Sequence, residues 1–200
     1  MNNISDTDLK AEILHRRQAS YIRLNGGFPI PLAGALYWLI LGISGYYLNL
    51  ANWAQLAFFG SGAIFPIALL FAKIFKNNFM KDKGIVDSVL LPTFISMLLF
   101  WPIMIAAVKT EPELVTIILA IGMSLHWPVI GWSYGRATLF SAHSIIRAVI
   151  VLYLWLAFPE ARLTWLPFSV AIIYTLTVIA LLFDVKYLSS IAKRNIRNLS

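Results

Sequence analysis

Cysteine is absent from the 200 residues, which excludes disulfides, iron–sulfur clusters and thiolate zinc sites. Charge is also scarce, because only 12% of the residues are Asp, Glu, Lys or Arg, against about a quarter in soluble domains. The chain has no Pro/Ser-rich linker and no low-complexity tract that would separate two domains. These absences exclude a typical soluble domain and predict a single compact unit.

Apolar residues instead make up 60% of the chain, and the mean hydropathy is +0.77. Runs of about 20 apolar residues are long enough to cross a hydrocarbon core about 30 Å thick, since a helix rises about 1.5 Å per residue. We therefore predict an all-α integral membrane protein, built as a bundle of six transmembrane helices. The predicted spans are residues 28–49, 53–75, 87–108, 113–134, 137–157 and 163–184.

The polar ends of the chain predict two further segments around a transmembrane domain at residues 26–185. Residues 1–25 predict a short amphipathic helix on the cytoplasmic membrane surface, because Leu9, Ile13 and Leu24 recur at roughly helical spacing among basic residues. Residues 186–200 predict a basic cytoplasmic tail.

Basic residues gather on one side of the predicted bundle, and only Lys109 and Arg162 fall on the other. The clustered residues are Lys10, Arg16, Arg17, Arg23, Lys73, Lys76, Lys81, Lys83, Arg136, Lys186, Lys193, Arg194 and Arg197. The positive-inside rule then places both termini in the cytoplasm, and we expect a bacterial cytoplasmic membrane. The net charge of +7 is explained by contacts with the lipid bilayer, so no nucleic-acid partner is predicted.

The hairpin formed by spans four and five carries an arginine at unusual depth. His126 and His143 lie about 9–12 Å below the cytoplasmic surface, and Arg147 lies about 15 Å below it, near the midplane. Arg136, His143 and Arg147 share one helical face, because they are seven and four residues apart. A charged side chain at this depth is costly and usually marks a functional site or an internal partner.

We predict that this basic face binds, or helps to transport, an anionic lipid or small solute that enters from the cytoplasm between spans four and five. Guanidinium groups match carboxylate and phosphate oxygens bidentately. Trp127, Trp132 and Tyr134 would frame the mouth, and Gly131 and Gly135 have a spacing that lets helices approach closely. The predicted ligand-binding residues are His126, Trp127, Ser133, Tyr134, Arg136, His143 and Arg147.

A structural role for Arg147 is the main alternative. Pro128 has no N–H group and frees the carbonyl of Ser124, which lies level with Arg147, so the guanidinium would satisfy that carbonyl at a kink. The chain would then be an accessory or assembly protein, whose apolar exterior binds a membrane partner protein or a second copy of the chain.

A cofactor site is a further alternative, because His126 and His143 would stand level on neighbouring helices as axial haem ligands or as part of a metal site. Two histidines without a carboxylate or thiolate make a poor metal set, and the nearby arginine would repel a cation. We therefore predict no cofactor and no metal.

Intramembrane hydrolysis is the remaining alternative, with a serine as nucleophile and a histidine as base. The candidate nucleophiles are Ser124, Ser141 and Ser144. Residues 122–125 are similar to the Gly-x-Ser-Gly motif of rhomboid proteases, but Leu125 replaces its last glycine and span six contains no histidine. No catalytic residue is predicted, and we do not expect an enzyme.

Two runs and a glycine pair carry a family resemblance: His126-Trp127-Pro128, Gly131-Trp132-Ser133-Tyr134-Gly135-Arg136 and Gly26-Gly27. Together with the Arg-rich amino-terminal helix, they resemble an uncharacterised family of small bacterial membrane proteins, which implies no activity. In size and helix count the chain is also similar to the substrate-binding subunits of energy-coupling-factor transporters. That likeness is an analogy of fold, and it implies transport without naming a cargo.

Overall fold

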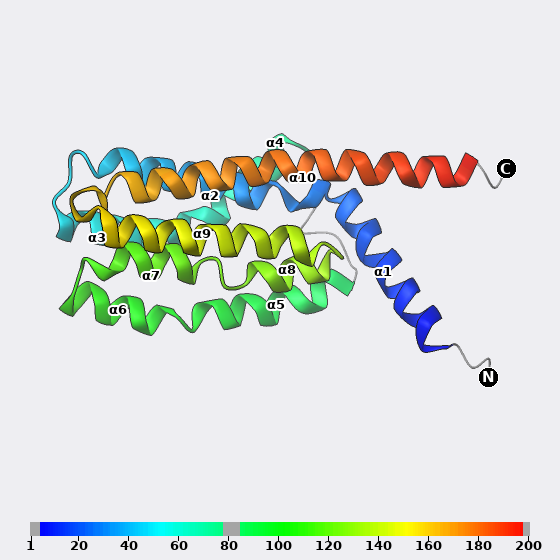
Figure 1. Ribbon diagram of the computed structural model, residues 1–200, viewed down its shortest axis with the longest axis horizontal. Helices are drawn as coiled ribbons and strands as arrows, with labels where there is room; N and C mark the ends of the chain where they lie inside the picture. Colours follow the sequence, from blue (N-terminus) through cyan, green and yellow to red (C-terminus); the bar gives the residue numbers. More distant parts are fainter. Residues whose placement is uncertain (1–4, 78–84, 198–200) are drawn as a thin grey trace.

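The computed structural model describes residues 5–77 and 85–197, and all regular elements within these ranges are helical. Lys81, Lys83 and the outermost residues of both predicted polar ends lie outside the described ranges. Six helical segments are long and apolar enough to cross a membrane, as predicted, and they lie side by side in an elongated bundle (Figure 1). These segments are Asn25–Ser44, Leu50–Ile74, Pro92–Thr110, Leu114–Ser133, Ala137–Ala157 and Trp165–Ala192.

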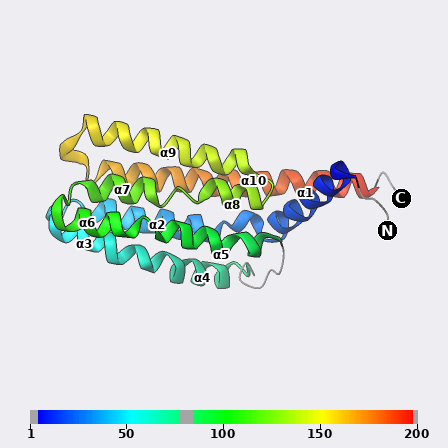
Figure 2. The same cartoon turned by 90° about the horizontal axis from the view of Figure 1, so that it is seen from below.

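Helix α1 (Asp6–Arg23) precedes the bundle and leaves it at an oblique angle (Figure 1). It begins where the Ser5 hydroxyl accepts the backbone N–H of Asp8 at 3.2 Å, which caps the first turn. The carboxyl-terminal part of α10 (Trp165–Arg197) extends beyond the bundle at the same end, as both views show (Figures 1 and 2). We call this end of the bundle the α1 end.

Three of the six segments are interrupted. The second segment is divided by a short 3-10 turn, and the third and fourth each stop and restart at a Trp-Pro pair. Pro102 and Pro128 occupy the first turn of the restarted helices, where a missing N–H leaves no bond unmade. The pieces are α3 (Leu50–Gly60), η2 (Ser61–Ala63), α4 (Ile64–Ile74), α5 (Ile85–Leu98), α6 (Trp101–Thr110), α7 (Leu114–Gly122) and α8 (Trp127–Ser133).

Helix α2 (Pro29–Ser44) is continuous and lies in the interior, where it packs closely against α10. Aromatic rings of α10 rest directly on two glycines of α2. A Cβ atom at Gly34 would lie 2.9 Å from the ring of Tyr174, and one at Gly42 would lie 2.8 Å from the ring of Phe168. The two glycines therefore set the distance between α2 and α10, since neither tolerates a side chain without displacing a ring.

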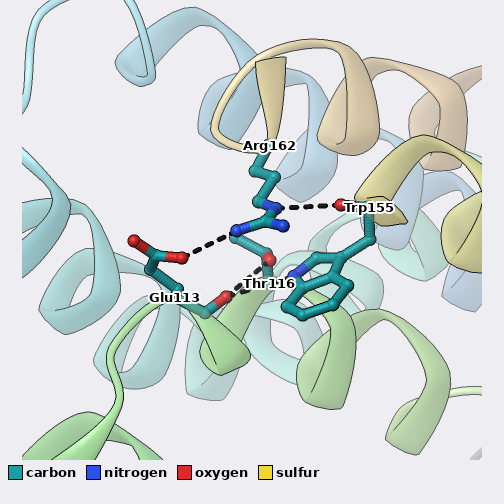
Figure 3. Close-up of polar contacts among 4 residues, drawn as sticks. All are labelled: Glu113, Thr116, Trp155 and Arg162. Carbon is teal, nitrogen blue, oxygen red and sulfur yellow. Dashed lines mark hydrogen bonds and ion pairs between the residues drawn. The ribbon is translucent and has the colours of Figure 1, made fainter. Parts of the chain in front are cut away.

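Arg162 joins three segments where the fifth segment connects to the sixth (Figure 3). Its guanidinium donates to the backbone carbonyl of Trp155 at 2.9 Å, and it lies 4.0 Å from the centre of that indole ring. It also pairs with the Glu113 carboxylate at 2.7 Å, at the start of α7. Trp155 belongs to α9 (Ala137–Ala157), so the contact ties α7, the end of α9 and the connection to α10 together.

We expect Arg162→Ala to destabilise the protein more than Glu113→Gln does. The Arg162 side chain is 17% exposed and its carbonyl bond and ring contact are shielded, whereas the Glu113 side chain is 58% exposed. Loss of the arginine should cost about 1–3 kcal/mol, and loss of the glutamate charge less than about 1 kcal/mol. Thermal unfolding of both variants in detergent measures this order, and an equal loss would mean that the ion pair dominates.

Candidate functional site

Arg147 stands at the centre of the bundle, on α9, and its side chain is 0% exposed. One guanidinium nitrogen, Nη1, donates to the hydroxyl of Tyr174 at 2.8 Å. The group also lies 4.9 Å from the ring centre of Tyr174 and 5.3 Å from that of Trp38, which gives cation–π attraction. Nε and Nη2 have no hydrogen-bond partner, and no carboxylate among the described side chains pairs with the guanidinium.

The carbonyl of Ser124 is satisfied without Arg147, which corrects the kink interpretation. The hydroxyl of Ser144 donates to this carbonyl at 2.9 Å, and the backbone N–H of Trp127 donates to it at 3.1 Å. Ser144 precedes Arg147 by almost one turn of α9. Its hydroxyl contacts the break between α7 and α8, where Ser124 lies. Pro128 therefore lies in the first turn of α8, where it leaves no carbonyl for Arg147 to satisfy, and the buried arginine needs another explanation.

His143 lies one turn before Arg147 on α9 and is held by a hydrogen-bond chain. Thr177 donates its hydroxyl proton to the carbonyl of Ile173 at 2.7 Å, so its oxygen accepts from His143 Nδ1 at 2.7 Å. This assignment leaves Nε2 as an acceptor, and that atom is buried without a partner. The indole of Trp127 stacks on the imidazole at 4.0 Å, with an angle of 16° between the planes.

A groove of about 510 Å³ runs between α9 and α10, and we call it the α9/α10 groove. Its α1 end is marked by Arg136, which binds the Asp184 carboxylate bidentately at 2.6 and 2.7 Å. His143 and Thr177 lie on its wall further in. The groove therefore lies between the fifth and sixth segments, whereas the sequence predicted entry between the fourth and fifth.

His126 opens on a different groove from His143. It lines a second groove of about 400 Å³ between α5 and α8, which we call the α5/α8 groove. The indole of Trp127 is stacked on His143, and its centre lies 6.4 Å from that of His126. The described residues contain no group of three or more His, Cys, Asp or Glu side chains that could hold a metal ion.

The remaining predicted ligand residues lie near α1. Ser133 is buried and donates its hydroxyl to the carbonyl of Ile130 in its own helix at 2.8 Å. The ring of Tyr134 packs against Tyr21 at 5.6 Å, while burial and the nearby Asp184 carboxylate raise the pKa of the Tyr21 hydroxyl. Trp132 is half-exposed, and the guanidinium of Arg17 lies 4.1 Å above it. These contacts join α8 to α1, in what we call the α1 junction.

The two predicted packing glycines belong to the same region. A Cβ atom at Gly131 would lie 2.4 Å from Cβ of Phe140, so this glycine lets α8 approach α9. Gly135 has a φ of +69° and turns the chain between α8 and α9, with Leu14 of α1 against it. The run from Gly131 to Arg136 therefore builds the α1 junction and the turn into α9.

Two of the three serines considered as nucleophiles, Ser124 and Ser144, bond to backbone carbonyls. Ser124 donates to the carbonyl of Ile121 at 2.7 Å, and Ser144 donates to that of Ser124. Within residues 5–77 and 85–197, no hydrogen bond joins a serine to a histidine. The described side chains thus offer no serine–histidine pair for hydrolysis.

Tyr174, Thr177 and Trp38 were missed by the sequence prediction. Tyr174 and Thr177 are three residues apart on an apolar helix, so they share a face, and that spacing was a usable signal. Trp38 carried no such signal, since an indole in an apolar run fits a core position as well as a site.

Fold and site together define the class of this protein: an all-helical bundle of six membrane-length segments around a fully buried arginine. The chain belongs to a family of unknown function, DUF7010, whose model matches residues 13–184. This match confirms the resemblance to an uncharacterised family, and it implies no activity. Searches of curated proteins and of solved structures returned no match.

Proposed function

We propose that the chain is an integral membrane protein that binds or transports an anionic solute or lipid through Arg147. The six apolar segments support the membrane placement, since each is long enough to span a bilayer. Helix α1 and the end of α10 lie at one end of the bundle, where the basic residues also gather, which supports a cytoplasmic location for both (Figure 1).

The observation that carries this proposal is the guanidinium of Arg147, buried with two nitrogens that lack a partner. Unpaired donors and an uncompensated charge are both costly away from water. A carboxylate or phosphate group supplies the missing charge and accepts from Nε and Nη2 together, as two parallel bonds.

The α9/α10 groove supplies the route. It reaches His143, which is one turn from Arg147, and its walls include Ile146 and Leu176, both of which are exposed on the outside of the bundle. In the proposed mechanism α9 moves against α10, so that the groove lengthens by one turn and reaches the guanidinium. The described conformation is then the closed conformation of the groove, in which Arg147 is buried and does not line the groove.

Native mass spectrometry of protein purified in mild detergent tests the proposal, with Arg147→Met as the variant and Arg16→Met as a matched control. Arg16 is an exposed arginine of α1. We expect a bound mass in wild type and in Arg16→Met, and its loss in Arg147→Met. A phospholipid mass would identify a lipid, and a smaller mass a free solute.

Two outcomes would contradict the proposal. One is a bound mass that persists in Arg147→Met, provided that thermal unfolding shows the variant to be folded. The other is the absence of any bound mass from wild type. If a protein partner copurified in that case, the accessory or assembly role would replace ligand binding.

A further inference from the structure

The α5/α8 groove has a different chemical character from the α9/α10 groove. Its described lining combines hydroxyl groups with one imidazole, and none of these described residues is charged. The polar members are Ser88, Thr93, Ser96 and His126, and the apolar members are Val89, Pro92, Met97, Leu125 and Val129. Such a lining suits an uncharged ligand that forms hydrogen bonds.

The groove lies beside two broken helices. Segment three is interrupted between α5 and α6, and segment four between α7 and α8, and both breaks are visible along neighbouring ribbons in Figure 1. The breaks touch, because a Cβ atom at Gly122 would lie 2.8 Å from the ring of Phe100. At membrane depth, irregular backbone occurs where it is buried in protein or lines a cavity, and paired broken helices often mark binding sites.

His126 stands at one of these breaks with an unused hydrogen-bonding atom. It is 9% exposed, lines the groove, and has no partner for its Nδ1 atom. The ring of Phe94 lies 6.1 Å away and gives the imidazole an aromatic neighbour. Since buried polar atoms are usually paired, Nδ1 marks the place where a ligand head would bond.

We propose that the α5/α8 groove binds a lipid-soluble quinone, that is, an uncharged ring with carbonyl oxygens on an apolar tail. Nδ1 of His126 donates to one carbonyl oxygen, and the ring packs beside Phe94. The tail leaves the groove past Leu125 and Val129, which are exposed on the outside of the bundle. This site is separate from Arg147, and the argument depends on the proposed function only for the membrane placement.

Quenching of tryptophan fluorescence by a benzoquinone with a decyl chain measures this binding on the full chain in detergent. Trp127 adjoins His126 and serves as a reporter. Val129→Phe fills the α5/α8 groove, and Ile146→Phe, a matched change on the α9/α10 groove, is the control. His126→Leu removes the donor to the carbonyl oxygen.

We expect saturable quenching in wild type and in Ile146→Phe. In Val129→Phe and His126→Leu, the affinity should fall by about tenfold or more, with thermal unfolding showing that both are folded. Wild type without saturable quenching would overturn the proposal, and so would wild-type affinity in Val129→Phe. Loss of binding in Ile146→Phe alone would place the quinone in the α9/α10 groove instead.

Discussion

Gly45→Ala is expected to lower the melting temperature of the purified protein by about 5–10 °C, as a clash of about 2–3 kcal/mol would do in a chain of this size. Gly45 follows the last residue of α2, and a Cβ atom there would lie 2.0 Å from the backbone oxygen of Leu163. That oxygen belongs to the connection between α9 and α10 and cannot rotate away. The φ of Gly45 is −61°, so the effect comes from space and not from backbone conformation.

Gly62→Ala provides the matched control. Gly62 lies in the 3-10 turn between α3 and α4, and a Cβ atom there would meet nothing within 4 Å. Its melting temperature should stay within about 2 °C of wild type. Equal losses at the two positions would mean that the clash with Leu163 does not cause the loss at Gly45. No loss at Gly45 would mean that the connection between α9 and α10 moves aside.

Arg147→Met is expected to stabilise the ligand-free protein, by about 1–4 kcal/mol in the free energy of unfolding. The guanidinium loses its hydration on burial and regains only one hydrogen bond and two ring contacts. Methionine has a similar length, adapts to irregular space and needs no partner. Thermal unfolding in detergent measures the change, which should be a rise in melting temperature.

Tyr174→Phe gives the opposite sign and serves as the comparison. It removes the hydroxyl that accepts from Nη1 of Arg147 and leaves the charge in place, so the melting temperature should fall. If Arg147→Met instead lowered the melting temperature as much as a core truncation does, the arginine would stabilise the bundle by itself. A stable variant that no longer retains a ligand would show that Arg147 serves binding at a cost in stability.

The number and approximate position of the helical segments could be predicted from the sequence, because long apolar runs have few other interpretations. Arg136 and Asp184 lie at the cytoplasmic ends of the predicted spans 137–157 and 163–184, so their ion pair agrees with the depths of these residues in the sequence. Both the apolar runs and the depth of a residue within a run can be determined from the local sequence. These are the parts of the fold that the amino-acid pattern determines without knowledge of the packing.

The arrangement of the site could not be predicted, because it depends on how each helix is rotated about its axis. Depth alone placed His126 and His143 level, yet they open on different grooves. The local sequence does not distinguish a proline in the first turn of a helix from one inside it, so it predicts a kink where the helix in fact breaks before Pro128. The pairing of α9 with α10 is likewise a matter of tertiary packing.

Helix α10 runs without a break from the centre of the bundle to the overhang beyond it. Tyr174 and Arg194 are separated by 20 residues, or about 30 Å along one continuous helix, so a tilt of the helix moves both positions together. A tilt of about 5° at Tyr174 would carry Arg194 about 2–3 Å sideways. A small change in the tilt of α10 beside Arg147 therefore becomes a larger displacement of the carboxyl-terminal part of α10 that extends beyond the bundle.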